Sequence, residues 1–334
     1  MDQVAKPIPM IPPNVALDGP RVSRWAVGSL LLAAVAVSAF DYGVRRDAAL
    51  QQVAFEVHRA MVDHTASSPH RYRVLVPMLL QPVVQAAERW TAPDLAFRRV
   101  YDVYYLAAFA AMLLALYAFL RRWYPQAEAL VGPLLVAATL PIALRNNYFE
   151  PASFLEPTLL TLALSWTCDG RHWRIVPLTA VASLSRETAV FIPVACWFAV
   201  NGWSLRSFNR TATAAALTAT AASAAIFASL RWWLGAAPHI PLSDVWAINV
   251  GWEGSHAALT NVTLFLGGTG WLLAAAGFRR APAFIRRASR VVPFYLAAVA
   301  VWGVWYEVRL LMTLYPVLVP CVVAGLFGEP RRDR

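Results

Sequence analysis

Long apolar runs separated by short polar stretches make up most of this 334-residue chain. A helix that crosses the hydrocarbon core of a membrane needs about 20 mostly apolar residues. Windows of about this length pick out Trp25 to Phe40, Val100 to Leu120, Ala127 to Leu144, Ala152 to Thr167, Ala212 to Leu234, Asn261 to Phe278, Val291 to Tyr306 and Leu310 to Phe327. The pattern predicts an all-α, polytopic membrane protein.

A further apolar block, Ile175 to Val200, is interrupted by Ser185, Arg186 and Glu187. Such an ion pair inside a single span costs free energy unless it lines a polar cavity. We therefore interpret the block as two short helices that meet at this polar break, which gives about ten transmembrane helices in total. The alternative, one long helix, gives an odd number of crossings and places the two ends of the chain on opposite sides.

Basic residues indicate the orientation, because loops on the cytoplasmic side of a membrane are enriched in lysine and arginine. With ten crossings, 17 of the 29 lysines and arginines fall in segments that share a side with the two chain ends. We therefore predict a cytoplasmic N-terminal tail (1–24), one transmembrane domain (25–327) and a cytoplasmic C-terminal tail (328–334). The stretch from Ala36 to Ala39 resembles a signal-peptidase site. Cleavage there would upset the even count, so we favour an uncleaved anchor.

The longest stretch between spans, residues 41–99, is the predicted first outer loop. Within it, Ala48 to Val62 has the pattern of an amphipathic helix that lies on the membrane surface. Val74 to Ala87 is apolar but too short to cross the membrane, so we interpret it as an interfacial or re-entrant helix. We find no segment with the composition of a soluble domain.

Composition supports the membrane class, since 59% of the residues are hydrophobic and only 14% are charged. A soluble domain carries about a quarter charged residues. We attribute the net charge of +10 to arginines that mark loops and contact anionic headgroups. This predicts contacts with membrane lipids and no nucleic-acid partner. The three cysteines are far apart and have no histidine or cysteine at metal-ligand spacing, so we predict no metal site there.

Thirteen of the nineteen acids fall on the outer side, where the predicted spans break. Ionisable groups at membrane depth usually remain for function. Asp41 directly follows the first span, at a rigid helix end where a general base can be held. It is therefore our candidate catalytic residue. The structural alternative is an interfacial residue that ends a helix beside an aromatic one.

His70, Arg71 and Arg73 lie at the head of the apolar segment that begins at Val74. In an extended stretch both arginines point to the same side, where two guanidinium groups suit the oxygens of a phosphate. The dipole of the following helix adds positive potential at the same place. We interpret these residues as a phosphate-binding group, and the alternative is unselective contact with lipid headgroups.

More charged residues fall on the same side. Arg186 and Glu187 either line a polar cavity or form a neutralising ion pair that shapes the helix break. Glu307 and Arg309 lie in a tight turn between the last two predicted spans, close to the membrane. The remaining substrate-binding candidates lie in other outer connections and are Arg145, Glu150 and Glu253.

Together these features resemble the GT-C superfamily of integral membrane glycosyltransferases, most closely its uncharacterised bacterial members. The shared order covers most of the chain: an acid after the first span, an outer loop with a surface helix, Arg-Tyr-Arg-Val-Leu-Val-Pro, an apolar-flanked Ser-Arg-Glu-Thr, and a late Glu-Val-Arg-Leu-Leu-Met-Thr-Leu-Tyr-Pro. The resemblance implies transfer of a sugar from a polyprenyl-phosphate donor to an acceptor on the outer face of the bacterial cytoplasmic membrane.

By this resemblance, Asp41 is the base that activates the acceptor hydroxyl. The lipid phosphate, and the charge that develops on it, are then bound by arginines: Arg71, Arg73 and either Arg186 or Arg309. Many family members pair acids in this loop around a divalent cation, whereas the acid nearest to Asp41 is Asp47. We therefore predict no cofactor, and the alternative of a divalent cation has no support in the sequence. The chain also lacks the soluble outer domain that often binds acceptors, which favours a small or lipid-linked acceptor.

Other functions use similar residues. A transporter or flippase of lipid-linked glycans binds phosphate without proton abstraction. It predicts polar residues at mid-membrane and broken helices in corresponding positions of two halves, neither of which is clear in the sequence. A polymerase that joins lipid-linked units uses similar arginines. A non-catalytic assembly partner tolerates the loss of Asp41 and Arg71.

Overall fold

A computed structural model describes residues 23–44, 48–144, 149–203, 208–235 and 241–330. Regular secondary structure in these residues is helical throughout, and no strand occurs among them. The all-α prediction is confirmed. The binding candidate Arg145 lies outside the described residues, as does most of the predicted N-terminal tail.

The helices follow one another closely along the chain. Their bounds are α1 Arg24–Val44, α2 Ala48–Val62, α3 Leu75–Glu88, α4 Pro93–Leu120, α5 Gln126–Leu144, α6 Leu155–Cys168, α7 Ile175–Ser183, α8 Phe191–Asn201, α9 Arg210–Leu234, α10 Leu242–Val250, α11 Trp252–Leu264, α12 Thr269–Gly277, α13 Ala283–Ala288, α14 Val291–Trp302 and α15 Tyr315–Phe327. The 3-10 helices that matter for the site are η1 His70–Tyr72, η2 Pro151–Phe154, η4 Glu187–Val190 and η7 Val308–Leu314.

Five helical segments of the described chain are long and apolar enough to cross a membrane: α1, α4, α5, α9, and η7 together with α15. The pair α11 and α12 passes the same test together but is bent by 60° at a short break, so up to six segments qualify. By contrast, α6, α7, α8 and α14 have 14, 9, 11 and 12 residues, fewer than a full span requires. The chain is therefore a helical protein with membrane-spanning character, and the crossings assigned to its shorter helices stay a prediction.

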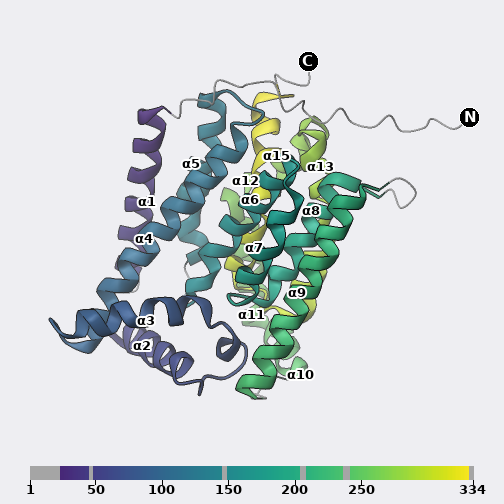
Figure 1. The fold of residues 1–334 in the computed structure, drawn as a ribbon. Coiled ribbons are helices and arrows are strands. Elements are labelled where there is room, and N and C mark those ends of the chain that lie inside the picture. Colours follow the sequence, from purple (N-terminus) through teal and green to yellow (C-terminus); the bar gives the residue numbers. More distant parts are fainter. Residues whose placement is uncertain (1–22, 45–47, 145–148, 204–207, 236–240, 331–334) are drawn as a thin grey trace, which may run out of the picture.

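Segments that are distant in sequence pack side by side in one bundle (Figure 1). α12 packs against α15, α7 against α9, and α1 against both α4 and α5. A β-carbon at Gly277 of α12 would lie 2.0 Å from the carbonyl oxygen of Cys321, and one at Gly325 would lie 2.4 Å from that of Leu273. Glycines at these positions let the two helices approach closely, as is common between helices in membranes.

α2 and α3 lie across one end of the bundle (Figure 1). α2 has the bounds predicted for the surface helix, and α3 begins and ends one residue later than the predicted short helix. His58 of α2 is 1% exposed, and its ring is hydrogen bonded to Gln81 of α3 and to Tyr101 of α4. The structure confirms that both segments are helical and shows that buried polar contacts join them to the bundle.

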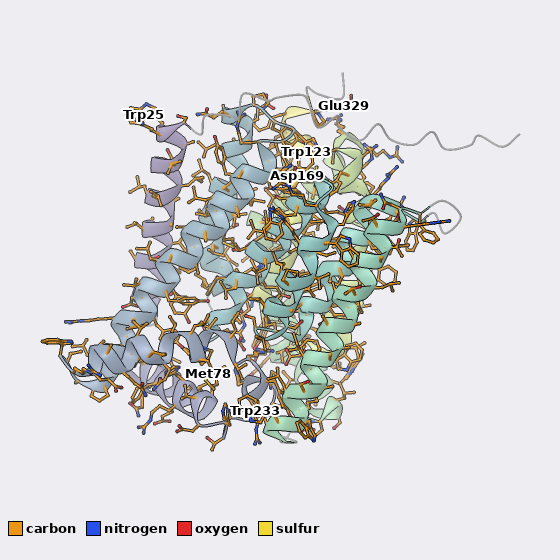
Figure 2. All side chains as sticks on the ribbon, in the orientation of Figure 1. Trp25, Met78, Trp123, Asp169, Trp233 and Glu329 are labelled. Atoms are coloured by element: carbon orange, nitrogen blue, oxygen red, sulfur yellow. The ribbon has the colours of Figure 1, made fainter. Side chains whose placement is uncertain are left out.

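The start of α1 and the end of α15 lie at the same end of the bundle. Figure 2 shows Trp25 and Glu329 at this end, with Met78 of α3 and Trp233 of α9 at the other. Trp25 and Trp233 are both largely exposed, as is typical of tryptophans at the boundary between membrane and water. This arrangement fits an even number of crossings.

The polar break in the apolar block separates two short helices, as predicted. α7 ends at Ser183, and α8 begins at Phe191 after the 3-10 helix η4. The backbone N–H of Leu75 donates a 3.0 Å hydrogen bond to the carbonyl oxygen of Leu184. The break therefore lies beside the start of α3, at the end of the bundle that α2 and α3 cover.

Candidate functional site

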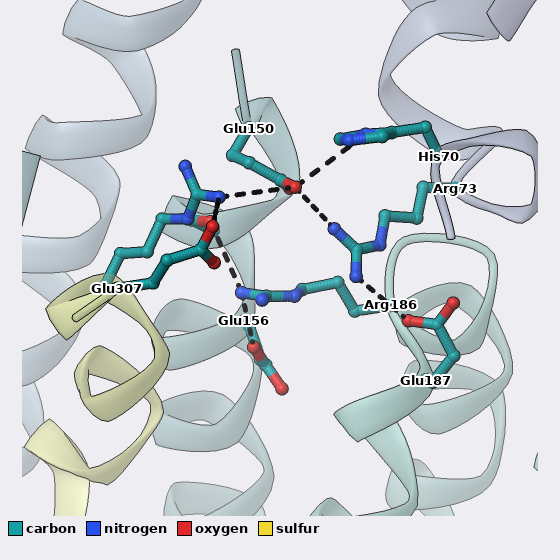
Figure 3. Close-up of polar contacts among 9 residues, drawn as sticks. His70, Arg73, Glu150, Glu156, Arg186, Glu187 and Glu307 are labelled. Atoms are coloured by element: carbon teal, nitrogen blue, oxygen red, sulfur yellow. Dashed lines mark hydrogen bonds and ion pairs between the residues drawn. The ribbon is translucent and has the colours of Figure 1, made fainter. Parts of the chain in front are cut away.

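Charged side chains form a cluster beside the start of α3 (Figure 3). At its centre is Glu150, whose side chain is 4% exposed. Nη1 of Arg73 donates a 2.6 Å hydrogen bond to Oε1 of Glu150. The same oxygen lies 3.7 Å from Nη2 of Arg309 and 3.7 Å from Nδ1 of His70. Two guanidinium groups and an imidazole thus surround one carboxylate oxygen.

Two further carboxylates contact these arginines. Oε2 of Glu187 lies 3.4 Å from Nη2 of Arg73, and Oε1 of Glu307 lies 3.0 Å from Nη2 of Arg309. The side chains of Glu187 and Glu307 are 34% and 22% exposed. They form the accessible part of the cluster, while Glu150 is enclosed.

A third arginine of the cluster, Arg186, lies in the break between α7 and α8. Nη1 of Arg186 donates to Oγ of Ser153 over 3.3 Å and lies 3.4 Å from Oε2 of Glu156. Nε of Arg186 and Oε1 of Glu156 are buried with no hydrogen-bond partner in the described part of the chain. Buried polar groups normally have a hydrogen-bond partner, so this pair keeps hydrogen-bonding capacity for water or a ligand.

The charged cluster consists of eight residues: His70, Arg73, Glu150, Glu156, Arg186, Glu187, Glu307 and Arg309.

The backbone next to Arg73 is held by contacts with the end of α9. Tyr72, in η1, is buried, and its hydroxyl donates a 3.0 Å hydrogen bond to the carbonyl oxygen of Gly235. The guanidinium group of Arg231 lies over the Tyr72 ring, 4.9 Å from its centroid, where the ring face attracts a cation. These contacts position Arg73 between α3 and α9.

Two asparagines hold the turn that precedes Glu307. Nδ2 of Asn249, on α10, donates to the carbonyl oxygen of Gly303, and its Oδ1 accepts from the N–H of Trp305, both over 2.9 Å. Nδ2 of Asn261, on α11, donates to another carbonyl oxygen of this turn over 2.9 Å. α10 and α11 thus position the start of η7 and the charged residues that it carries.

We expect Asn249→Leu to lower the free energy of unfolding by about 1–3 kcal/mol, because it leaves one backbone donor and one backbone acceptor of the turn without their partner. Ser255→Ala on α11 is the control, since this exposed hydroxyl donates only to its own helix. Denaturation of the purified protein in mixed micelles measures both variants. Equal stability of Asn249→Leu and the control would show that the turn does not depend on this clamp.

Ionisation in the cluster follows from burial and from neighbouring charge. Burial raises the pKa of Glu150, but its cationic neighbours, Arg73 and Arg309 foremost, outweigh this effect and lower the pKa to about 2. Burial lowers the pKa of His70 below its ordinary value, against the opposing effect of Glu150. At neutral pH the cluster therefore contains an ionised Glu150 and a neutral His70.

The structure brings together most of the residues proposed from sequence as binding residues. These are His70, Arg73, Glu150, Arg186, Glu187, Glu307 and Arg309. They come from four separate segments of the chain, so no local motif contains the site. Their proximity is a structural result, while their role in binding substrate stays a prediction.

Other candidates are not among the ion pairs and hydrogen bonds of the charged cluster described above. Asp41 is 1% exposed in the last turn of α1. Arg71 lies in η1 and is only partly buried, and Glu253 is exposed in the first turn of α11. Arg145 lies outside the described residues. The functions predicted for these residues stay predictions.

Sequence reasoning did not include Glu156 and Ser153 among the binding residues. Glu156 lies in the first turn of the apolar helix α6 and is buried. An acid at the start of an apolar helix is an ionisable group at membrane depth, and this signal identifies it. Ser153 has no comparable signal, because single serines are common in helices of membrane proteins.

The charged cluster has the chemistry of an anion site. Arginine forks that bind a carboxylate oxygen also match the oxygens of a phosphate. The more exposed carboxylates next to them are able to accept a proton or a hydroxyl hydrogen bond. Among the described residues, no group of three or more His, Cys, Asp or Glu side chains is placed to hold a metal ion.

Neither a protein-family model, nor a curated protein, nor a solved structure matches this chain. Its function is therefore argued from the geometry of the charged cluster.

Proposed function

We propose that this protein is a GT-C-like glycosyltransferase of the bacterial cytoplasmic membrane. It moves a sugar from a polyprenyl-phosphate donor to an envelope glycan, lipid or protein acceptor at the outer face. The observation that carries the proposal is the convergence of Arg73, Arg186 and Arg309, from three separate segments, at one end of a bundle with membrane-spanning helices.

Arg73 and Arg309 are the residues that we assign to the lipid phosphate. Both lie within ion-pair distance of the same oxygen of Glu150, so two guanidinium groups already converge on one anionic atom. A phosphate that binds beside Glu150 and takes the place of Glu187 receives charge-assisted hydrogen bonds from both guanidinium groups. Negative charge grows on the phosphate as the sugar leaves, and guanidinium groups held in place stabilise this charge.

In this proposal the phosphate takes the place of a carboxylate. The described cluster contains four carboxyl groups and three guanidinium groups. A phosphate added to this set would leave uncompensated negative charge in a poorly solvated site, which is costly. Glu187 is the most exposed of the four and is held by one ion pair at 3.4 Å. We therefore assign it as the group that moves aside when the donor binds.

Asp41 is the general base of the proposed reaction. It takes the proton of the acceptor hydroxyl, whose oxygen forms a bond to the anomeric carbon. The bond from that carbon to the phosphate oxygen breaks, and its electron pair leaves with the phosphate. Because Asp41 is buried in the last turn of α1, binding of the acceptor has to open this end of the bundle. We assign no step to a metal ion.

The proposal includes ten crossings with both tails in the cytoplasm. Two of the short helices are lengthened by 3-10 turns, since η2 with α6 covers 151–168 and η4 with α8 covers 187–201. The basic helix α13 lies at the same end of the bundle as the start of α1 and the end of α15 (Figure 1). Basic residues favour the cytoplasmic side, which supports an outward-facing charged cluster.

A transporter or flippase of lipid-linked glycans is the second candidate, and a broken helix favours it. α11 and α12 meet at a 60° bend, where Leu266 and Gly267 have φ values of 54° and 71°. Broken helices often form the binding sites of secondary transporters. A polymerase that joins lipid-linked units is the nearest enzymatic alternative, because it uses arginines in the same way.

Mass spectrometry of membrane lipids and envelope glycans tests the transferase. A strain that lacks the native copy expresses the wild type, Asp41→Asn, Arg73→Ala or Asp169→Asn at matched levels. Asp169 pairs with Arg122 at the opposite end of the bundle (Figure 2) and serves as the control. We expect Asp41→Asn to accumulate a polyprenyl-phosphate sugar and to lose one glycan modification, because the acceptor hydroxyl is no longer deprotonated.

An unchanged lipid and glycan profile in Asp41→Asn contradicts the assignment of Asp41 as the base. If Arg73→Ala alone is defective, the arginines bind lipid phosphate without this catalysis. That result favours the transporter.

A further inference from the structure

A cavity lies among the outer-loop helices, and none of its lining residues belongs to the charged cluster. It has a volume of about 300 Å³, opens to the surface and is lined by residues of α2, α3 and the start of α4. Its polar lining includes Arg59, Asp63, Gln81 and Glu88, and its apolar lining includes Phe55 and Val84. The volume is at the lower end of the range for small-molecule sites.

A buried histidine orients one wall of this cavity. His58 lines it, and its Nε2 lies 2.9 Å from Oε1 of Gln81, while its Nδ1 lies 3.0 Å from Oη of Tyr101. Burial lowers the pKa of His58 below its ordinary value, so the ring is neutral at pH 7. A neutral ring that donates from Nε2 to Gln81 accepts at Nδ1 from the tyrosine hydroxyl. The amide nitrogen of Gln81 is then the donor that this side chain offers to the cavity.

The other walls provide both kinds of hydrogen-bonding group beside apolar surface. The guanidinium group of Arg59 is a donor and lies over the ring of Phe55, 5.7 Å from its centroid. Asp63 and Glu88 carry acceptor oxygens. Phe55 and Val84 form apolar patches between these groups. A ligand that fits this lining carries hydrogen-bond donors, hydrogen-bond acceptors and apolar C–H faces close to one another.

We propose that this cavity binds a neutral, polyhydroxylated group, a sugar residue. Each hydroxyl both donates and accepts a hydrogen bond, as the mixed wall requires, and the C–H faces of the ring pack on the aromatic and aliphatic side chains. A phosphate would meet two carboxyl groups and one guanidinium group. An amine cation would be attracted by these carboxyl groups but repelled by Arg59, whereas a neutral group has no like charge to meet.

Aromatic side chains connect the cavity with the charged cluster. The ring of Phe149 lies 6.3 Å from that of His58, 5.2 Å from that of Tyr101 and 5.9 Å from that of Phe97. Phe149 is 2% exposed and directly precedes Glu150. Ring contacts of His58 thus link the cavity to Phe149, the residue next to Glu150 at the centre of the charged cluster. On the proposed function, on which this assignment rests, the cavity holds the sugar of the acceptor rather than that of the donor.

Binding of methyl glycosides to the full-length protein in lipid nanodiscs tests the cavity. The probes are methyl α-glucoside, methyl α-galactoside and methyl α-mannoside. Saturation-transfer NMR detects their binding, and no glycoside detergent is used because it would compete with the probes. We expect Gln81→Leu to weaken binding of the best probe at least ten-fold, because a site built to hydrogen bond a hydroxyl loses its donor. Gln85→Leu is the matched control, since Gln85 is exposed on the same helix.

A second pair of variants keeps the test decisive if Gln81→Leu does not fold. Asp63→Asn removes an acceptor charge of the cavity wall, and Glu56→Gln removes an exposed one on α2 that accepts from Gln52. We expect weaker glycoside binding only in Asp63→Asn. The proposal is overturned if the wild type binds no glycoside, or if each variant binds it as well as its control does. It is also overturned if benzylamine displaces the bound glycoside at a concentration below that of the glycoside.

A parallel measurement with decaprenyl phosphate separates this proposal from the proposed function. Arg73→Ala is expected to lose decaprenyl phosphate and to keep the glycoside. If the wild type binds glycosides in the cavity but not decaprenyl phosphate, the sugar site stands and the donor assignment fails. If bound glycoside is released by a polyprenyl-phosphate sugar but not by decaprenyl phosphate, the cavity holds the donor sugar, and its assignment to the acceptor is overturned.

Discussion

Replacing Arg73 with alanine is expected to weaken binding of decaprenyl phosphate by about 200-fold, which corresponds to about 3 kcal/mol. Arg73 makes the shortest contact of the charged cluster, at 2.6 Å from Glu150, and also reaches Glu187. Its backbone is held by the contacts of Tyr72, so its side chain loses little conformational freedom when it binds an anion. Removal of this fork takes away two charge-assisted hydrogen bonds in a poorly solvated site.

Native mass spectrometry of nanodiscs loaded with decaprenyl phosphate measures this loss. Arg71→Ala is the matched control, because it removes the same charge two residues earlier, from a side chain without an ion pair in the described part of the chain. We expect it to weaken binding less than ten-fold. Arg73→Lys keeps the charge but not the fork, and we expect an intermediate loss. Equal losses in Arg71→Ala and Arg73→Ala would mean that positive charge alone, and not the observed geometry, binds the lipid.

Glu150→Gln is expected to lower the free energy of unfolding by about 3 kcal/mol, because removal of one partner from a buried ion pair leaves the other charges uncompensated. Arg73 and Arg309 both use Oε1 of Glu150, so the substitution affects two guanidinium groups at once. Glutamine keeps the size of the side chain and so isolates the charge. Denaturation in mixed micelles at pH 7 measures the effect.

The pH dependence of this difference follows from the low pKa of Glu150. The folded protein lowers the pKa from 4.5 to about 2, so the unfolded state binds the proton more readily. The stabilisation is therefore fully present above about pH 4.5 and is lost as the pH falls towards 2. We expect the stability difference between wild type and Glu150→Gln to shrink over this interval and to vanish below it.

Asp169→Asn is the control for this pair of measurements. It also removes a carboxylate that pairs with an arginine, but both side chains are partly exposed, so we expect a change of less than about 1 kcal/mol. A difference for Glu150→Gln no larger than for this control, or one that stays constant from pH 5 to pH 2, contradicts the ion-pair geometry at Glu150.

Local pattern was enough to predict several elements of the fold. The bounds of α2 follow from its amphipathic spacing, and the separation of α7 from α8 follows from Arg186 and Glu187 in an apolar block. These predictions succeed because both patterns are local. Apolar side chains favour burial and charged ones oppose it, so each short segment carries the signal for its own helix. Span length was less predictable: α7 has nine residues, since other helices, and not only lipid, surround it.

The sequence by itself determined that this is a helical membrane protein and that most of its acids fall on one side of the predicted spans. Only the tertiary structure decided which of them meet. Arg71 and Arg73 were equivalent in the sequence, yet Arg73 contacts Glu150 and Glu187. Likewise, the sequence places Glu150 in an outer connection among other candidates, and the structure makes it the centre of the cluster. The physical reason is that an ion pair requires contact within about 4 Å, and that distance depends on how helices from distant segments rotate and pack.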